Sequence, residues 1–328
     1  MTQETRPTMG DIARTAGVSQ MTVSRVMRGS GQVSEAVRQR VEEAARALGY
    51  VPNRLAMALR DDSTPLVAVI LPTLENRVFS EVLGGVTEVL GRHGLQPVFG
   101  VTEYDLEREE ELVRDLLAWR PRGVILPGLE HTEATRAALR ASGVRVAEVM
   151  DIDGAPIAAA FGVSQAEAGR MTARHMLARG YRRFAHVGGP RGRDLRAEKR
   201  LAGFREVVRE AGAEVVAEEV VDGPSMVAGR LATGRLLDGV RPEAVYYAND
   251  DLAAGGMMEC LARGVAMPGG LALAGFNGLA FLDALPCRLT TVETPRHEMG
   301  LRAARYVVEG GDEARVDLGL RLVAGETC

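Results

Sequence analysis

The segment of residues 19–26 combines polar and apolar side chains at the spacing of a short helix. Val23 and Val26 stand three residues apart, so both should lie on the inner face of that helix. The outward face then carries four side chains, which are Gln20, Met21, Ser24 and Arg25. Glutamine can bond adenine through two hydrogen bonds, arginine can bond guanine, and methionine can pack on the methyl group of thymine. The chemistry predicted for this face is the reading of base edges in the major groove of DNA.

Local sequence signals predict that this helix is the second of a close pair. Thr8 stands three residues before Asp11, which approximates a capping box and predicts the start of a short helix. The sequence Ala-Gly-Val at 16–18 predicts a tight turn, and Ser19 can cap the second helix, which should end near Met27. An ordinary helical hairpin is the alternative interpretation. The coincidence of turn, small residues and polar outer face favours a helix-turn-helix unit.

A third helix and an excess of positive charge belong to the same part of the chain. Ser34 can cap a helix over residues 35–48, and Gly49 can end it. Between residues 6 and 60, nine arginines stand against four acidic residues. Such an excess suits binding to phosphates, although a solvated helix surface would explain the charge equally well.

From residue 66 onward, short apolar runs alternate with helical segments, which predicts βαβ units and a parallel sheet. The apolar runs are 66–71, 98–101, 123–126, 144–149, 184–188, 215–221, 245–248 and 271–276. The helices between them include 80–92, 106–119, 165–179, 197–211 and 251–263. Because one sheet of so many strands is less common than two, we expect two doubly wound subdomains with several chain crossovers. The predicted organisation is a headpiece (1–52), a hinge and linker (53–65) and an α/β module (66–328).

Ligands of parallel α/β sheets bind at the carboxyl ends of the strands. Candidate loops therefore follow the apolar runs, and a helix that carries residues 199–204 opens near such an end. The candidate ligand-binding residues in these places are Thr73, Leu74, Phe79, Asp151, Arg200, Asn249 and Asn277.

Residues 8–60 resemble the headpiece of the lac/galactose repressor family, and the resemblance extends through essentially the whole chain. The matching segments are 11–13, 16–19, 22–25, 33–34 and 49–54. The resemblance implies an all-α helix-turn-helix headpiece and a periplasmic-binding-protein-like module that binds a small-molecule effector. It also implies a homodimer that binds operator DNA.

The same resemblance assigns roles to further residues of the headpiece and hinge. It implies that the DNA-binding residues include Thr8, Ser19, Thr22, Asn53 and Arg54 in addition to the outward face of the second helix. Residues 54–60 match the family's hinge helix, and Leu59 matches the leucine that is inserted into the minor groove of the operator.

In the effector module, Asn249 matches the asparagine of the family's Ala-Asn-Asp motif, and Arg200 matches an effector-binding arginine. Asn277 falls where many sugar-binding members have an aspartate, whose carboxylate would repel an anionic ligand. With asparagine there, Arg200 could pair with a ligand carboxylate.

The chain is most similar to the gluconate-utilisation branch of the family, in the segments 21–25, 71–74, 78–83, 148–151, 249–253 and 294–296. Together with Asn277, this resemblance predicts a sugar acid such as gluconate as the effector. A neutral sugar or a purine, with Arg200 in a structural ion pair, remains the alternative.

Other classes of protein fit the sequence poorly. Residues 72–74 follow the first strand where a nicotinamide enzyme would carry a Gly-x-Gly-x-x-Gly loop, and no phosphate loop of the P-loop type is present. The five histidines and three cysteines show no metal spacing. We therefore expect no cofactor, no metal and no enzymatic activity. A periplasmic carrier would need a signal peptide and no headpiece, and neither a signal sequence nor a membrane-spanning apolar stretch is apparent, so a cytoplasmic location is expected.

Overall fold

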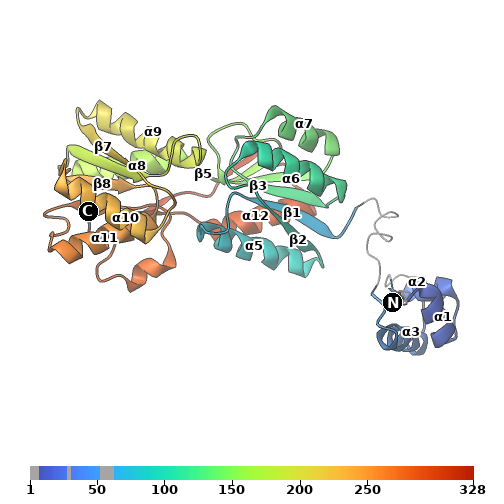
Figure 1. Cartoon of the computed structure of the whole chain (residues 1–328). Helices are drawn as coiled ribbons and strands as arrows, with labels where there is room; N and C mark the ends of the chain where they lie inside the picture. Colours follow the sequence, from blue (N-terminus) through green and yellow to red (C-terminus); the bar gives the residue numbers. More distant parts are fainter. Residues whose placement is uncertain (1–6, 28–30, 52–62) are drawn as a thin grey trace, which may run out of the picture. The chain divides into compact units, whose positions relative to one another are not determined.

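The computed structural model describes residues 7–27, 31–51 and 63–328 of the chain (Figure 1). The chain divides into two compact units, Met1–Thr64 and Pro65–Cys328. The predicted hinge residues Asn53, Arg54 and Leu59 lie outside the described residues, so their assigned roles stay predictions.

Helix caps of the predicted kind organise the first unit. Its described residues form α1 (Met9–Ala16), α2 (Gln20–Met27) and α3 (Glu35–Ala47). The capping box at α1 is confirmed, because Thr8 Oγ1 accepts from the Asp11 N–H at 3.3 Å and Asp11 Oδ2 accepts from the Thr8 N–H at 2.9 Å. Ser19 Oγ accepts from the Thr22 N–H at 3.1 Å at the start of α2. Ser34 precedes α3 as predicted, but its side chain makes no capping hydrogen bond.

A small apolar core holds the three helices of this unit together. Ile12, Val23 and Val41 are fully buried, one from each helix. Gly17 takes a left-handed conformation with φ of 62°, which glycine adopts without steric cost and which lets the chain reverse between α1 and α2. The close pair of helices predicted from the sequence is therefore present.

The second unit contains two parallel sheets with helices on both faces, in the two lobes shown in Figure 1. Lobe A consists of β1 (Leu66–Leu71), α5 (Val78–Arg92), β2 (Gln96–Val101), α6 (Leu106–Ala118), β3 (Gly123–Pro127), α7 (Glu133–Ser142), β4 (Arg145–Asp151), β5 (Ala159–Val163), α12 (Arg296–Glu309) and β11 (Arg315–Asp317), with strand order β11-β5-β4-β3-β1-β2. Lobe B consists of α8 (Gln165–Ala178), β6 (Arg183–Gly188), α9 (Leu195–Glu210), β7 (Glu214–Val220), α10 (Met226–Asp238), β8 (Ala244–Tyr247), α11 (Asp250–Arg263) and β9 (Ala272–Ala274), with strand order β7-β6-β8-β9.

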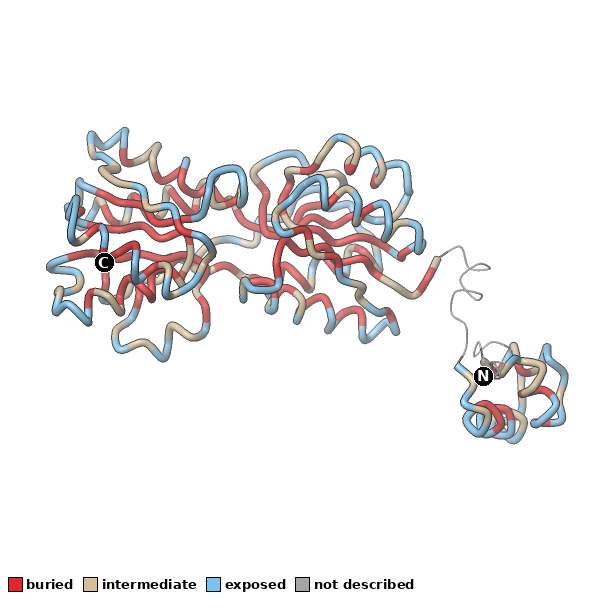
Figure 2. Tube along the Cα trace, viewed as in Figure 1, coloured by how far each residue is buried: buried red, intermediate tan, exposed pale blue. Residues whose placement is uncertain are grey.

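The central strands are buried on both faces, which explains why they appear in the sequence as continuous apolar runs. In β1, Val67 and Val69 face the core formed with α5 and α12. Ala68 and Ile70 alternate with them and face the core formed with α6 and α7. The burial colours of Figure 2 follow this arrangement, with the strands mainly buried and the outer helix faces exposed. The prediction of two doubly wound subdomains is confirmed.

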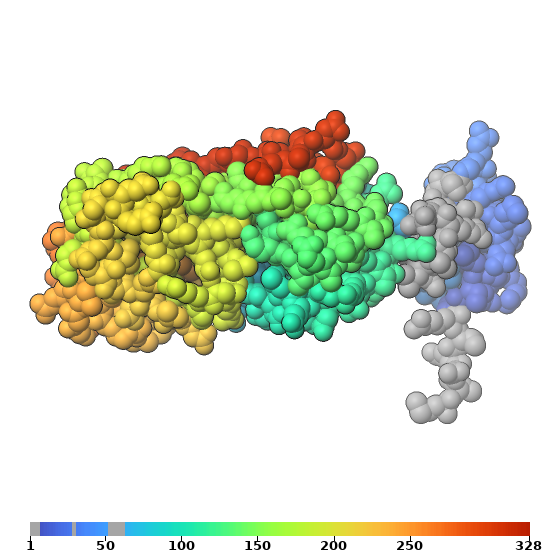
Figure 3. Space-filling model, turned by 90° about the horizontal axis from the view of Figure 1, so that it is seen from above, coloured from blue at the N-terminus to red at the C-terminus, as the bar shows by residue number. Residues whose placement is uncertain are grey.

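The chain passes between the lobes three times. It leaves lobe A after β5 and returns from β9 to α12 through β10 (Thr291–Glu293), with a short 3₁₀ turn η1 (Ala280–Ala284) on the way. After β11 it crosses again through β12 (Arg321–Val323), which pairs antiparallel with β10. The last residue, Cys328, is buried in the core of lobe B. Figure 3 shows this C-terminal segment, in red, running along both lobes.

Several elements of the second unit were not among the segments predicted from the sequence. They are the strands β5, β10, β11 and β12 and the helices α7, α10 and α12. Within the described part of the chain, no helix is both long enough and apolar enough to span a membrane.

A buried acid–base cluster supports lobe A beside the end of β3. His131 Nδ1 lies 2.6 Å from Glu109 Oε1 of α6, and His131 Nε2 lies 3.2 Å from Glu148 Oε1 of β4. All three side chains are buried. Burial lowers the pKa of His131, but the two carboxylates outweigh that effect and raise it from 6.5 to about 9.

This cluster predicts a loss of stability in mild alkali. Because the pKa of folded His131 exceeds its unfolded value of 6.5, its stabilising contribution is complete below pH 6.5 and is lost as the pH rises through about 9. Urea denaturation of the full chain should show the free energy of unfolding falling by about 3 kcal/mol over this range. The His131→Gln variant should lack that decrease. An unchanged pH dependence in the variant would contradict the assignment.

A candidate ligand-binding cavity and nucleic-acid interface

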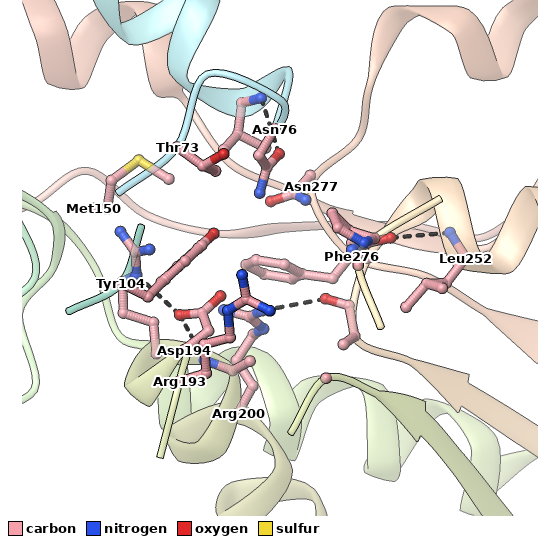
Figure 4. A pocket seen from close by; sticks show the side chains of 18 of the residues that line it. Thr73, Asn76, Tyr104, Met150, Arg193, Asp194, Arg200, Leu252, Phe276 and Asn277 are labelled. Atoms are coloured by element: carbon pink, nitrogen blue, oxygen red, sulfur yellow. Dashed lines mark hydrogen bonds and ion pairs between the residues drawn. The ribbon is translucent and has the colours of Figure 1, made fainter. Parts of the chain in front are cut away.

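A cavity of about 290 Å³ opens where the carboxyl ends of the two sheets face each other (Figure 4). Lobe A contributes loops that follow β1 and β2 and the end of β4, and lobe B contributes the start of α9 and the loops after β6, β7, β8 and β9. Polar residues of the lining include Thr73, Asn76, Tyr104, Gln165, Asp194, Arg196, Arg200, Asn249 and Asn277. A volume of this size suits a small metabolite.

Arg200 lies at the centre of the cavity lining and is 7% exposed. Its Nη1 donates to Gln165 Oε1 at 2.6 Å, and its Nη2 donates to the carbonyl oxygen of Ala248 at 3.1 Å. The guanidinium carbon lies 4.1 Å from the centre of the Phe276 ring, a cation–π contact visible in Figure 4. The Nε atom is buried without a hydrogen-bond partner.

The hydrogen-bond and ring partners of Arg200 are all neutral, which distinguishes it from the other two arginines of the described lining. Arg196 Nε lies 3.3 Å from Asp194 Oδ1, and Arg193 Nη1 lies 3.6 Å from Asp222 Oδ1. Burial raises the pKa of Asp194, but the charges of Arg196 and Arg200 outweigh that effect and lower it overall. Asp194 is therefore ionised and compensates one buried guanidinium, which leaves the interior of the cavity with one positive charge in excess.

Three further predicted residues lie in the cavity lining with Arg200. Thr73 Oγ1 accepts from the Glu75 N–H at 3.2 Å, and Asn249 Oδ1 caps α11 by accepting from the Leu252 N–H at 2.9 Å. Asn277 is buried and has a φ of 121°. Its N–H donates to the Val292 carbonyl at 2.9 Å, and its own carbonyl accepts from Arg296. The backbone of Asn277 is thus fixed while its carboxamide lines the cavity.

The other three predicted residues do not line the cavity. Leu74 is 71% exposed on the loop after β1. Phe79 is buried in the core of lobe A and stacks under Arg196, whose guanidinium carbon lies 5.6 Å from the ring centre. Asp151 is buried and pairs with Lys199. All three follow predicted strands in the sequence, but their side chains are not part of the cavity lining.

Several lining residues were missed by the sequence reasoning. Tyr104 has a positive φ of 66° in the loop after β2, and burial is the largest of the effects that raise the pKa of its hydroxyl. Gln165 begins α8 directly after the first crossover and links the Met150 carbonyl, 2.5 Å away, to Arg200. Asp194 caps α9 six residues before Arg200, and Arg196 stands four residues before Arg200 on the same helix, which was the available signal.

Close packing of α8 on α9 brings Arg200 to its position. A Cβ atom added to Gly169 of α8 would lie within 2 Å of the Arg200 carbonyl oxygen, and one added to Gly203 of α9 would lie 2.1 Å from the Ala166 carbonyl oxygen. Only glycine permits this approach at either position, because any side chain would force the helices apart.

The outward face of α2 in the headpiece has the exposure that its predicted role requires. Val23 and Val26 are buried, as predicted. Gln20, Met21 and Arg25 are exposed, and Met21 is 64% exposed. Arg25 Nη2 lies 3.6 Å from Met21 Sδ, so the two side chains share one surface. Thr8 and Ser19 are exposed, and Thr22 and Ser24 are half-buried.

No group of three or more histidine, cysteine or acidic side chains in the described residues could hold a metal ion. Fold and site together define a helix-turn-helix headpiece carried by a chain with a two-lobed ligand-binding module.

Comparisons with known proteins identify the family. Residues 8–53 match the family described as bacterial regulatory proteins, lacI family, and residues 173–328 match a periplasmic binding protein-like domain. The HTH-type transcriptional regulator GntR of Pseudomonas aeruginosa is 40% identical over 98% of this chain and 96% of its own length. The regulator of the same name from Escherichia coli K12 is 33% identical over 98% of both chains. A crystal structure of a lacI-family transcriptional regulator from Silicibacter pomeroyi is 44% identical, with a TM-score of 0.93 over 98% of this chain and 99% of that one.

The chain therefore belongs to the lacI family of bacterial transcriptional regulators, which confirms the predicted resemblance. It is a regulator and not an enzyme, because its relatives and its fold are those of regulators.

Proposed function

We propose that this regulator represses transcription as a homodimer on a pseudo-palindromic operator, and that a sugar acid such as gluconate controls its affinity for DNA. One headpiece would bind each half-site through the outward face of α2. The effector would bind in the cavity between the lobes. The full-length similarity to regulators named GntR supports this branch of the family.

The observation that carries the effector assignment is the excess positive charge of Arg200. A buried guanidinium whose partners are all neutral is stabilised by an anionic ligand. The acidic side chains at the rim, Glu75, Glu103 and Asp222, are exposed, so water and salt screen their charges. The buried groups therefore dominate the electrostatics of the cavity, and they favour one carboxylate.

The polar neutral groups around Arg200 suit the rest of such a ligand. Asn249, Asn277 and Thr73 offer both hydrogen-bond donors and acceptors, and Asp194 offers acceptors. A chain of hydroxyl groups can both donate to and accept from these side chains. An open-chain aldonate has one carboxylate and several hydroxyls, which matches this set.

A neutral sugar or a purine is the alternative effector. The Phe276 ring in the cavity lining and the two carboxamides would also suit such a ligand, with Arg200 serving as a structural residue. An effector of any kind can shift the affinity for DNA only if it binds one arrangement of the lobes better than the other.

Calorimetric titration tests the effector class. D-gluconate should give saturable heat with the DNA-free protein, whereas ribose and hypoxanthine should give none. Asn277→Asp should weaken gluconate binding roughly tenfold, because it places a second carboxylate beside the ligand. Aspartate tolerates positive φ about as well as asparagine, so the backbone should be unaffected. The matched control is Asp222→Asn at the exposed rim, which should leave the affinity unchanged. Equal affinity of Asn277→Asp and wild type would contradict the charge argument.

Mutation of the headpiece tests the DNA-binding surface separately. Arg25→Ala should weaken operator binding by about 1–3 kcal/mol and relax the preference at one base pair. Arg40→Ala removes an equal charge from an exposed position of α3, and it should affect specific and nonspecific DNA alike. Leu59→Ala should also act mainly on the operator. Fluorescence anisotropy with operator and random duplexes would measure all three, and equal losses on both duplexes for Arg25→Ala would rule out base readout.

A further inference from the structure

Lys199 is the only lysine in the chain, and it connects the two lobes. It lies on α9 in lobe B, next to Arg200. Its Nζ atom lies 2.5 Å from Asp151 Oδ2, 2.5 Å from Glu130 Oε1 and 2.9 Å from the Asp153 carbonyl oxygen. These three oxygens belong to the end of β4 and the neighbouring loops of lobe A, so one ammonium group meets three lobe A oxygens.

The environment makes this ion pair stronger than an ordinary surface pair. Asp151 is fully buried, and the Lys199 side chain is 22% exposed. Burial lowers the pKa of Lys199, but Asp151 and Glu130 outweigh it and raise the pKa overall. At Asp151 the effect of burial is larger than that of Lys199 and raises the pKa of the carboxyl, so the close contact of the charges and not their titration is what marks the pair. Charges that are held in contact away from water interact more strongly and are less screened by salt. The pair forms only while the lobes keep this separation, because its two sides belong to different lobes.

A parallel connection runs from the neighbouring residue through the cavity. Arg200 donates to Gln165 Oε1, and Gln165 Nε2 donates to the Met150 carbonyl at 2.5 Å. Lys199 and Arg200 are consecutive in α9, and Met150 and Asp151 are consecutive at the end of β4. Any motion that separates Lys199 from Asp151 therefore also displaces the arginine that faces the ligand.

We propose that Lys199 is a positioning residue that holds the lobes in the arrangement that binds the effector, without touching the effector itself. It sets effector affinity by stabilising one separation of the lobes against others. The proposal rests on the proposed function in one respect, namely that an effector binds between the lobes. It predicts that effector binding strengthens the contacts of Lys199 and that these contacts strengthen effector binding.

Chemical cross-linking tests the bridge without any assumption about the effector. A carbodiimide activates a carboxyl group, the Lys199 amine attacks the activated carbon, and an amide forms while the reagent leaves as a urea. Because the chain has one lysine, every cross-link from a lysine side chain arises at Lys199. Mass spectrometry of the full-length protein should identify Lys199 joined to Glu130, whose side chain is 32% exposed. Absence of any cross-link from Lys199 to Glu130 or Asp151 would overturn the proposal.

Variants test the effect on affinity. Lys199→Met keeps the length of the side chain and removes the charge, and we expect it to weaken gluconate binding roughly tenfold. The matched control is Arg302→Met, which breaks an ion pair of 2.6 Å with Glu298 inside one helix of lobe A and should leave the affinity unchanged. Because Lys199→Met leaves the buried Asp151 carboxylate without its cationic partner, the double variant Lys199→Met with Asp151→Asn removes both charges of the pair and guards against misfolding. It should show the same loss of affinity.

The dependence of the cross-link on ligand separates this role from a purely structural one. Gluconate should increase the yield of the cross-link from Lys199 to Glu130 in the wild type. Wild-type affinity in the double variant, or a cross-link yield that gluconate leaves unchanged while it binds, would overturn the proposal. If gluconate gives no heat with the wild type, the effector assignment fails, and the ligand-free cross-link still decides whether Lys199 bridges the lobes.

Discussion

A guanidinium group that is buried among neutral partners is costly unless a ligand or a network of dipoles compensates its charge. Arg200 meets this condition, with an amide oxygen, a carbonyl oxygen and an aromatic face around it and with its Nε atom unpaired. The close contact of α8 with α9, the glycines that permit it and the position of Gln165 all serve to keep the group in place. The electrostatic character of the cavity follows from this one side chain, because its neighbour Arg196 is compensated by Asp194.

Because the chain crosses between the lobes, residues from both lobes surround the cavity that contains the charge of Arg200. Each sheet directs the carboxyl ends of its parallel strands toward the same cavity, and three crossovers connect the lobes. Arg296 is buried at the second crossover, where it donates to the backbone carbonyl of Asn277 and lies 2.9 Å from Glu81 of α5. The cavity-lining residue Asn277 is therefore held by helices of lobe A although it follows a strand of lobe B. A ligand that contacts both Asn277 and Arg200 is therefore connected to elements of both lobes.

Local features of the structure could be predicted from the sequence, whereas the assembly of the cavity could only partly be predicted. The capping box of Thr8 and Asp11 depends on neighbouring residues, and the apolar runs of buried parallel strands are visible without any tertiary information. The strand β5 escaped prediction because it consists largely of alanine and glycine with few β-branched residues. Phe79 and Asp151 were predicted as ligand-binding residues near strand ends, yet Phe79 joins the core from within α5 and Asp151 pairs with Lys199. Tyr104 was missed because its position in the cavity depends on a left-handed loop conformation, which no sequence motif indicates.

The most direct test of the central claim compares D-gluconate with D-glucitol in calorimetric titrations of the wild-type protein. The two molecules share the carbon chain and its hydroxyl groups, and they differ in a carboxylate against an alcohol at one end. If the unpaired charge of Arg200 selects the ligand, D-glucitol should bind at least about a hundredfold more weakly than D-gluconate, the loss expected when charge-assisted hydrogen bonds are removed. Equal affinities for the two molecules would show that the carboxylate is not recognised and would contradict the account.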